Sequence, residues 1–205
     1  MVLLPAVGIG LLIGFLTRGS LAGFSLARFR LLPLLILAVF IQVLIFTPLM
    51  GQTAFVLDYG HYIYMGTILM TVAVFARNLH IPGLVVILIG AVLNGIAIFS
   101  NGGYMPTDAD LLSEAGRLEY VQQSEDSTAA GEKLTHTNSV IADDDTRFAF
   151  LGDIFALPDN VPLANVYSIG DIFVAVGGGA TTARAMHLQP RGATSQRRVS
   201  EQQPA

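Results

Sequence analysis

The chain has no cysteine among its 205 residues, and charged residues make up only 13% of it. The missing cysteines exclude disulfides, thiolate metal sites and cysteine nucleophiles. The charged fraction is about half the norm of roughly 25% for a globular domain. Hydrophobic residues make up 53% of the chain, and its mean hydropathy is +0.61. This composition is typical of a membrane protein.

Five apolar stretches approach the roughly 20 residues that cross a hydrocarbon core of about 30 Å. They cover residues 1–17, 31–50, 59–75, 81–100 and 162–182. They predict an all-α membrane protein with a bundle of five transmembrane helices in one domain, residues 1–182. A polar loop, residues 101–161, lies between the fourth and fifth stretches, and residues 183–205 form a polar tail.

Basic residues predict the orientation of these stretches. Eight of the eleven lie after the first stretch, between the third and fourth, or in the tail. Since basic residues beside membrane helices mark the cytoplasmic face, we expect a plasma-membrane protein with its N-terminus outside and its C-terminus in the cytoplasm. The tail is expected to be disordered.

The long outer loop has three parts. It opens with a turn signature, Asn101-Gly102-Gly103-Tyr104-Met105-Pro106, after which Thr107 is expected to cap a helix. Residues 123–146 are polar and aperiodic and are expected to be mobile. Residues 147–157 are too short to span a bilayer and too apolar for a free loop, so they predict a short interfacial or re-entrant helix on the outer side.

Asp171 is the strongest candidate for a functional group. In a helix that begins at Pro162 it lies about 14 Å along the axis, near the middle of a bilayer, where a carboxyl group costs about 2.5–3.5 kcal/mol. Asn165 and Ser168 precede it at intervals of three and form a polar stripe. Two interpretations remain open: a titratable functional group, or a set of hydrogen bonds that holds neighbouring helices together.

A near-repeat suggests a second possibility. Leu151-Gly152-Asp153-Ile154-Phe155 is followed by Ile169-Gly170-Asp171-Ile172-Phe173. Two adjacent carboxylates can share a proton and activate water, so Asp153 and Asp171 are a candidate catalytic pair for a membrane-embedded aspartyl hydrolase. The context of neither aspartate completes the motif of an intramembrane aspartyl protease or a lipoprotein signal peptidase.

Small residues favour close helix packing elsewhere. Gly83, Gly90, Asn94, Ala97 and Asn101 share one face of the fourth stretch, which is typical of a helix–helix seam. The same interpretation covers Gly10-x-x-x-Gly14 and the run Gly177-Gly178-Gly179.

No cofactor is expected. Asp58 and His61 offer a cation site, but the four histidines lack ligand spacing, so no metal is assigned. The glycine pairs lack the context of a nucleotide site, and basic residues are too few for nucleic-acid binding. The expected partners are the lipid bilayer and either a membrane protein or a second copy of the chain.

Several segments resemble an uncharacterised family of small bacterial multi-pass membrane proteins, a domain of unknown function. The resemblance rests on the order and spacing of four segments: Asn101 to Pro106, Asp145-Thr146-Arg147, Leu151-Gly152-Asp153-Ile154, and Asn165 to Ile172. It implies a cluster at the outer membrane face that joins the Asn101 turn, Arg147, Asp153, Asn165 and Ser168. In that cluster Arg147 is expected to neutralise Asp153 or to bind an anionic group.

The resulting prediction is a non-enzymatic membrane module that binds a small ligand or a partner. A transporter with Asp171 as its titratable group and an aspartyl hydrolase remain the alternatives. The candidate binding residues are Asn101, Arg147, Asp153, Asn165, Ser168 and Asp171.

Overall fold

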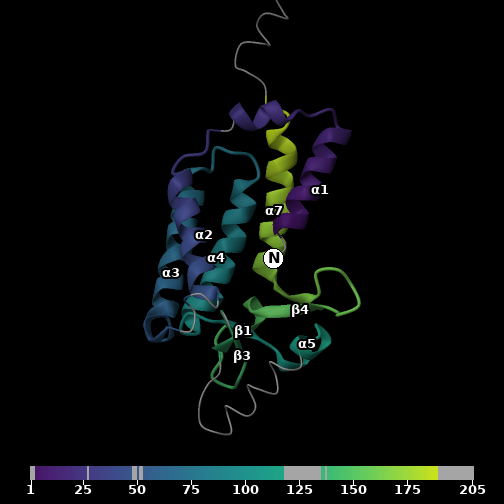
Figure 1. The fold of residues 1–205 in the computed structure, drawn as a ribbon. Coiled ribbons are helices and arrows are strands. Elements are labelled where there is room, and N and C mark those ends of the chain that lie inside the picture. Colours follow the sequence, from purple (N-terminus) through teal and green to yellow (C-terminus); the bar gives the residue numbers. More distant parts are fainter. Residues whose placement is uncertain are drawn as a thin grey trace, which may run out of the picture.

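A computed structural model describes residues 3–26, 28–47, 50, 53–117, 135–136 and 138–188 of the chain. The five longest helices stand side by side, and a small sheet gathers at one end of them (Figure 1). Their bounds are α1 Leu3–Leu16, α2 Leu32–Phe46, α3 Ala54–Arg77, α4 Leu84–Ser100 and α7 Ile169–Ala185. The end that carries the sheet is called the sheet end here, and the other is the opposite end.

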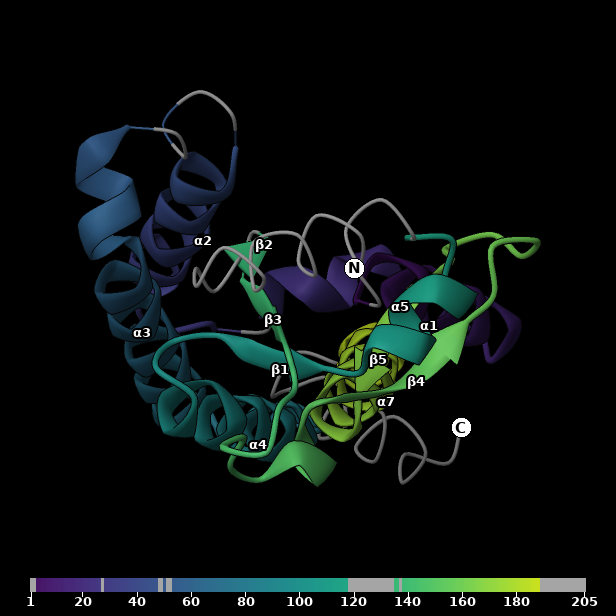
Figure 2. The same ribbon diagram turned by 90° about the horizontal axis from the view of Figure 1, so that it is seen from below.

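The helices form a curved row. Contacts join α2 to α3, α3 to α4, α4 to α7, and α7 to α1, and the view along the helices shows the same order (Figure 2). A short 3-10 helix, η1 (Leu21–Leu26), lies across the opposite end of α7 and α1 (Figure 1). The row leaves α2 and α1 at its two edges, so each long helix packs on one or two neighbours only.

The sheet lies between α4 and α7 in the sequence. It contains β1 (Met105–Thr107), β2 (Thr135–His136), β3 (Ser139–Ile141), β4 (Asp153–Leu157) and β5 (Asn165–Ser168), in the order β2-β3-β1-β4-β5. β1 is parallel to β3 and β4, whereas the two outer pairs are antiparallel. A one-and-a-half-turn helix, α5 (Ala109–Glu114), packs on β4 and β5. β5 runs directly into α7, so the sheet and the helix row share a continuous backbone.

The predicted all-α fold of five transmembrane helices is therefore wrong. The structure is a mixed α/β fold with a five-stranded sheet. Among the described residues, only Ala54–Arg77 is long and apolar enough to cross a membrane; Pro5–Leu16, Leu32–Phe46 and Leu84–Ser100 are apolar but shorter. The expected fifth stretch begins too early, because residues 165–168 pair with β4 and the helix begins only at Ile169.

The outer loop also differs from expectation. The segment expected to form an interfacial or re-entrant helix, residues 147–157, instead forms a 3-10 turn, η2 (Ala149–Leu151), and strand β4. Thr107 ends β1, and Asp108 is the residue that caps α5. Residues 123–134 and 137 of the segment expected to be mobile lie outside the described residues. Residues 189–205 of the expected disordered tail also lie outside them.

Small residues bring α7 close to both of its neighbours. A Cβ on Gly10 of α1 would meet the carbonyl oxygen of Gly179, and one on Gly90 of α4 would meet that of Gly170. A Cβ on Gly177 would collide with Ile87. These contacts confirm the predicted seams, because each position has room for hydrogen only.

Candidate functional site

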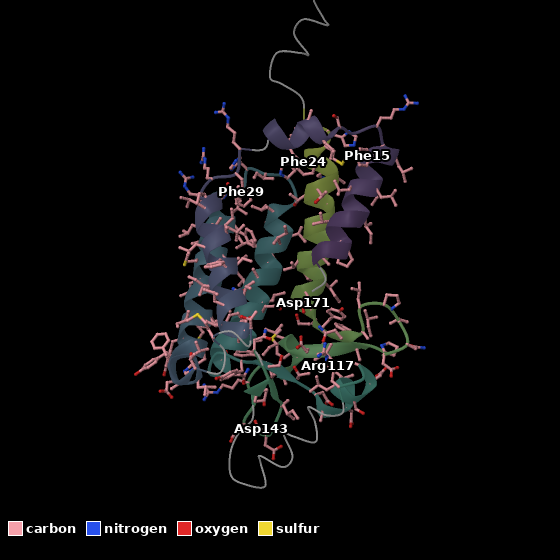
Figure 3. The ribbon with its side chains drawn as sticks, in the orientation of Figure 1. Phe15, Phe24, Phe29, Arg117, Asp143 and Asp171 are labelled. Carbon is pink, nitrogen blue, oxygen red and sulfur yellow. The ribbon has the colours of Figure 1, made fainter. Side chains whose placement is uncertain are left out.

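Asp171 lies in the first turn of α7, at the junction between the helix row and the sheet (Figure 3). Its backbone N–H donates to Ser168 Oγ over 3.0 Å, and its Oδ2 accepts from the Ser168 N–H over 3.2 Å. This reciprocal pair is a capping box, which satisfies two N–H groups that the helix itself leaves free. The prediction that Asp171 lies about 14 Å along a helix that begins at Pro162 is wrong, because the helix begins at Ile169, two residues before it.

Asn94 of α4 joins this cap to the neighbouring helix. Its Nδ2 donates to Asp171 Oδ1 over 3.2 Å, and its Oδ1 accepts from Ser168 Oγ over 2.8 Å. Asn94 therefore uses both ends of its amide on the start of α7. This geometry agrees with the helix-holding interpretation of the polar stripe at Ser168 and Asp171.

Asp153 lies beside this cap, on the neighbouring strand. It is the cross-strand partner of Ser168 in β5 and of Thr107 in β1, so three polar residues form a row across the sheet. All three are buried, and Thr107 Oγ1 donates to Asp153 Oδ2 over 3.1 Å. Thr107, Asp153, Ser168, Asp171 and Asn94 are called the polar junction below.

The polar junction raises the pKa of Asp153. Burial of the carboxyl group, followed by the nearby charge of Asp171, raises it from 3.8 to about 7, while the hydrogen bond from Thr107 acts in the opposite direction. Burial favours the neutral acid because the ionised form loses its hydration, and a second negative charge adds to that effect. The two aspartates of the predicted pair are thus electrostatically coupled.

The electrostatic interaction between Asp153 and Asp171 is not sufficient for a hydrolytic site. Both oxygens of Asp171 accept hydrogen bonds, from Asn94 and from the Ser168 backbone. Asp153 is buried, with only 8% of its surface exposed. Both oxygens of Asp171 are thus engaged, and burial of Asp153 restricts the access of water that a general base requires.

Asn101 and Arg147 meet at the sheet end of α4, as the predicted cluster requires. Asn101 Nδ2 donates to the Arg147 carbonyl over 2.8 Å, and its Oδ1 accepts from the Arg147 N–H over 2.9 Å. The same Nδ2 donates to the Ala97 carbonyl over 2.8 Å. Asn101 therefore holds the backbone of Arg147 and leaves its side chain exposed.

Asn101, Arg147 and Asn165 of the predicted cluster lie outside the polar junction. Arg147 is exposed and forms no ion pair with Asp153, and its charge does not contribute to the raised pKa of that residue. The neutralisation expected for this pair is wrong. Asn165 lies at the far end of β5, where it pairs with Leu157.

The predicted cation site at Asp58 and His61 has a different environment. The ring of His61 packs on Tyr62 and Tyr104, with ring centroids 3.9 Å and 6.0 Å away. Its Nδ1 is buried without a hydrogen-bond partner. Within the described ranges, no group of three or more acidic or histidine side chains is placed to hold a metal ion.

Sequence reasoning overlooked Asn78 and misassigned Thr107. Asn78 follows the last residue of α3 and is fully buried. Its Nδ2 donates to the Arg30 carbonyl over 2.7 Å and to the Val74 carbonyl over 2.8 Å, and its Oδ1 accepts from the Arg30 N–H over 2.6 Å. The signal in the sequence was an asparagine directly after an apolar helix. A buried amide must form hydrogen bonds, and in apolar surroundings its partners are backbone groups.

The fold and the polar junction define a mixed α/β protein in which a helix row carries a small sheet at one end. A model for a family of unknown function, DUF5317, matches residues 26–180, and the chain belongs to this family. The match confirms the resemblance to an uncharacterised family, and it leaves α1 outside the matched part. No curated protein and no solved structure matches the chain.

Proposed function

We propose that the protein is a module of the plasma membrane, with the apolar surface of its helix row against lipid and its sheet on the outer face. The observation that carries this proposal is the separation of charge between the two ends of the row. Arg18, Arg28, Arg30, Arg77 and Arg184 all flank the opposite end, and no acidic residue of the described ranges accompanies them. Ten described acidic residues belong to the sheet end, where Figure 3 shows Asp143 and Asp171.

Hydrogen bonds establish which segments share an end. At the opposite end, the Ser20 N–H donates to the Met186 carbonyl over 2.8 Å, and Asn78 bonds Arg30. At the sheet end, Ser168 bonds Asn94, and Asn138 Nδ2 donates to the hydroxyl of Tyr64 over 3.3 Å. The sorting of charge therefore follows the packing of the chain. Five of the seven described arginines lie at the opposite end, and Arg117 and Arg147 lie at the sheet end with the acidic residues. This excess of basic residues agrees with a cytoplasmic face at the opposite end.

The surface between the two ends is apolar. Large hydrophobic side chains are exposed along all five long helices, including Leu12 at 59%, Ile36 at 60%, Leu69 at 59%, Val85 at 50% and Val176 at 60%. A water-soluble protein rarely leaves so many contiguous apolar side chains uncovered. Lipid is the occupant that this surface fits, because acyl chains contact apolar side chains without loss of hydrogen bonds.

The helix lengths differ, and among the described helices only α3 is long enough to cross an average bilayer. α3 has 24 residues and spans about 36 Å, whereas α1 has 14 residues and spans about 21 Å. The shorter helices thus fall below the roughly 30 Å of an average hydrocarbon core, a mismatch that a bilayer accommodates by thinning. The apolar 3-10 helix η1 lies across the opposite end of α1 and α7 and adds apolar residues there.

The polar junction supports a non-enzymatic role for this module. Asp171 is bonded to a neighbouring helix and caps its own helix, so its carboxylate fastens α7 and the sheet to α4. The sheet is thereby fixed on the helix row as an outer platform for a small ligand or a protein partner. A transporter subunit is the second candidate, and the observation that favours it is the pKa of Asp153, about 7, which places a titratable group near neutrality.

Single cysteines test this placement directly, because the natural chain has none. Asp144→Cys lies at the sheet end and Arg184→Cys at the opposite end, and both positions are exposed. A membrane-impermeant maleimide is expected to label the first in intact cells and the second only after the membrane is opened.

Val39→Cys is the matched control. Val39 lies in α2 with 51% of its surface exposed, yet lipid is expected to shield it from the reagent both before and after opening. Equal labelling of Asp144→Cys and Arg184→Cys in intact cells contradicts the orientation. Labelling of Val39→Cys in the opened membrane contradicts the lipid-covered helix row.

A further inference from the structure

Three arginines gather at one corner of the opposite end, near the start of α2 and the end of α3. Arg28 and Arg30 lie in the segment between η1 and α2, and Arg77 is the last residue of α3. All three side chains are exposed, and among the described residues no acidic side chain belongs to this end of the molecule. These three residues are called the arginine cluster below.

The cluster is held in place at three points. Asn78, which directly follows Arg77, bonds both the N–H and the carbonyl of Arg30. His80 Nε2–H donates to the Arg28 carbonyl over 3.1 Å. Between the two arginines, Phe29 packs against the buried cluster of Ile81, Leu84 and Ile87. The backbone of this segment is therefore fixed, and the exposed Arg28 and Arg30 flank an anchored phenylalanine in the chain.

The surroundings of the cluster are apolar. Leu31 and Leu32, which directly follow Arg30, are 51% and 44% exposed, and Leu79, two residues after Arg77, is 47% exposed. Guanidinium groups without acidic partners attract phosphate, and exposed leucines beside them contact acyl chains. A nucleic acid or a free anion would contact the arginines but not the leucines. A phospholipid contacts both, because its phosphate binds the guanidinium groups and its acyl chains pack on the leucines.

We infer that the arginine cluster binds the phosphate headgroup of an anionic phospholipid on the cytoplasmic side of the membrane. This inference rests on the proposed membrane placement of the helix row. The fixed backbone distinguishes it from a general attraction to a charged surface, because it presents Arg28, Arg30 and Arg77 to one headgroup without a large loss of chain freedom.

Two charge-matched double variants test the site. Arg28→Gln/Arg30→Gln removes two charges from the cluster, and Arg18→Gln/Arg184→Gln removes two from elsewhere at the same end. The purified full chain, in an uncharged detergent, is titrated with phosphatidylglycerol, and the bound lipid is counted by native mass spectrometry. The first variant is expected to bind about thirty-fold more weakly than the natural chain, because each arginine that contacts the bound headgroup contributes about fivefold and two are removed. The second is expected to stay within about fivefold.

Two asparagine variants separate geometry from charge. Asn78→Ala removes the bonds to Arg30 and keeps every charge, and Asn101→Ala removes the same set of bonds at the sheet end. Asn78→Ala is expected to lose most of the phosphatidylglycerol binding, whereas Asn101→Ala retains it. An excess of inorganic phosphate is expected to leave the bound lipid in place.

The outcomes distinguish this inference from the proposed function. If both double variants lose binding equally, or phosphatidylcholine binds as well as phosphatidylglycerol, the lipid site is wrong while the membrane placement stands. If inorganic phosphate displaces the lipid, the cluster is a site for the free anion instead. Release of the natural chain from membranes by alkaline carbonate overturns the proposed function itself.

Discussion

Asn78 and Asn101 make the same set of hydrogen bonds at opposite ends of the helix row. Each follows the last residue of a long helix, and each side-chain Nδ2 donates to the carbonyl four residues earlier. Each also bonds the N–H and the carbonyl of one arginine, Arg30 for Asn78 and Arg147 for Asn101. The two amides thus complete a helix end and attach a distant segment to it, a pattern called the asparagine clamp here.

Removal of either clamp is expected to destabilise the protein by similar amounts. Asn78→Ala and Asn101→Ala each delete three hydrogen bonds, which together contribute about 2–4 kcal/mol to stability. Hydrogen exchange is expected to accelerate at the Arg30 N–H in the first variant and at the Arg147 N–H in the second. Asn160→Ala, in an exposed turn, is the control and is expected to change neither rate. Unchanged exchange at both arginines contradicts the clamp.

Loss of the Asp171 side chain is expected to weaken the attachment of α7. Asp171→Leu removes the capping box and leaves Asn94 without its acceptor, so we expect a loss of about 2–3 kcal/mol. Asp171→Asn keeps an oxygen for the Ser168 N–H and is expected to lose less. Thermal unfolding in detergent measures both variants, with Asp110→Asn in α5 as an exposed control. Asp171→Leu with the stability of the natural chain is the result that contradicts this account.

The positions of the helices could be predicted because the apolar pattern of a helix involves residues that are close together in the sequence. Apolar runs at residues 31–50 and 81–100 correspond to α2 and α4 within a few residues, and hydrophobic periodicity depends on near neighbours only. Helix α3 is longer than its predicted stretch, 59–75, since Thr53 caps it and apolar residues follow at once. Gly10 and Gly90 were likewise recognised as seam residues from their spacing alone.

The sheet was missed because its pairs are distant in sequence. Met105 pairs with Ser139, and Thr107 with Asp153, so no local pattern records either contact. β5 has only four residues and continues an apolar segment into α7, which made a single helix the simpler interpretation. The placement of Asp171 failed for the same reason, since its depth was counted from Pro162 and not from Ile169. The residues of β4, Asp153 to Leu157, do not alternate between polar and apolar, so the alternating burial of this strand has no counterpart in the sequence pattern.

Two glycines of α1 are expected to respond in opposite ways to alanine. A Cβ on Gly10 meets the backbone of Gly179 in α7, so Gly10→Ala is expected to cost about 1–3 kcal/mol through overpacking. A Cβ on Gly8 has nothing within 4 Å, so Gly8→Ala is expected to be neutral or to stabilise the helix by up to about 1 kcal/mol. Thermal unfolding compares the two, and equal effects would contradict the close packing of α1 on α7.

Stability is expected to fall as the pH rises through the range in which Asp153 titrates. The pKa of this carboxyl is about 7 in the folded chain and 3.8 as the reference value, so the folded state binds its proton more tightly than the unfolded state. The resulting stabilisation is complete below about pH 4 and is lost as the pH approaches 7. Between pH 5 and pH 8 the loss amounts to roughly 2–3 kcal/mol.

Asp153→Asn isolates this contribution, because the amide oxygen still accepts from Thr107 and the side chain no longer titrates. Unfolding of the natural chain and the variant is measured from pH 5 to pH 8, with Asp144→Asn as an exposed control. The natural chain and the control are expected to lose stability relative to Asp153→Asn as the pH rises. Asp171→Asn, which removes the neighbouring charge, is expected to make the decline smaller, since that charge is the second cause of the raised pKa. Parallel curves for the natural chain and Asp153→Asn would show that the buried carboxyl is already ionised at pH 5, and that the polar junction stabilises its charge.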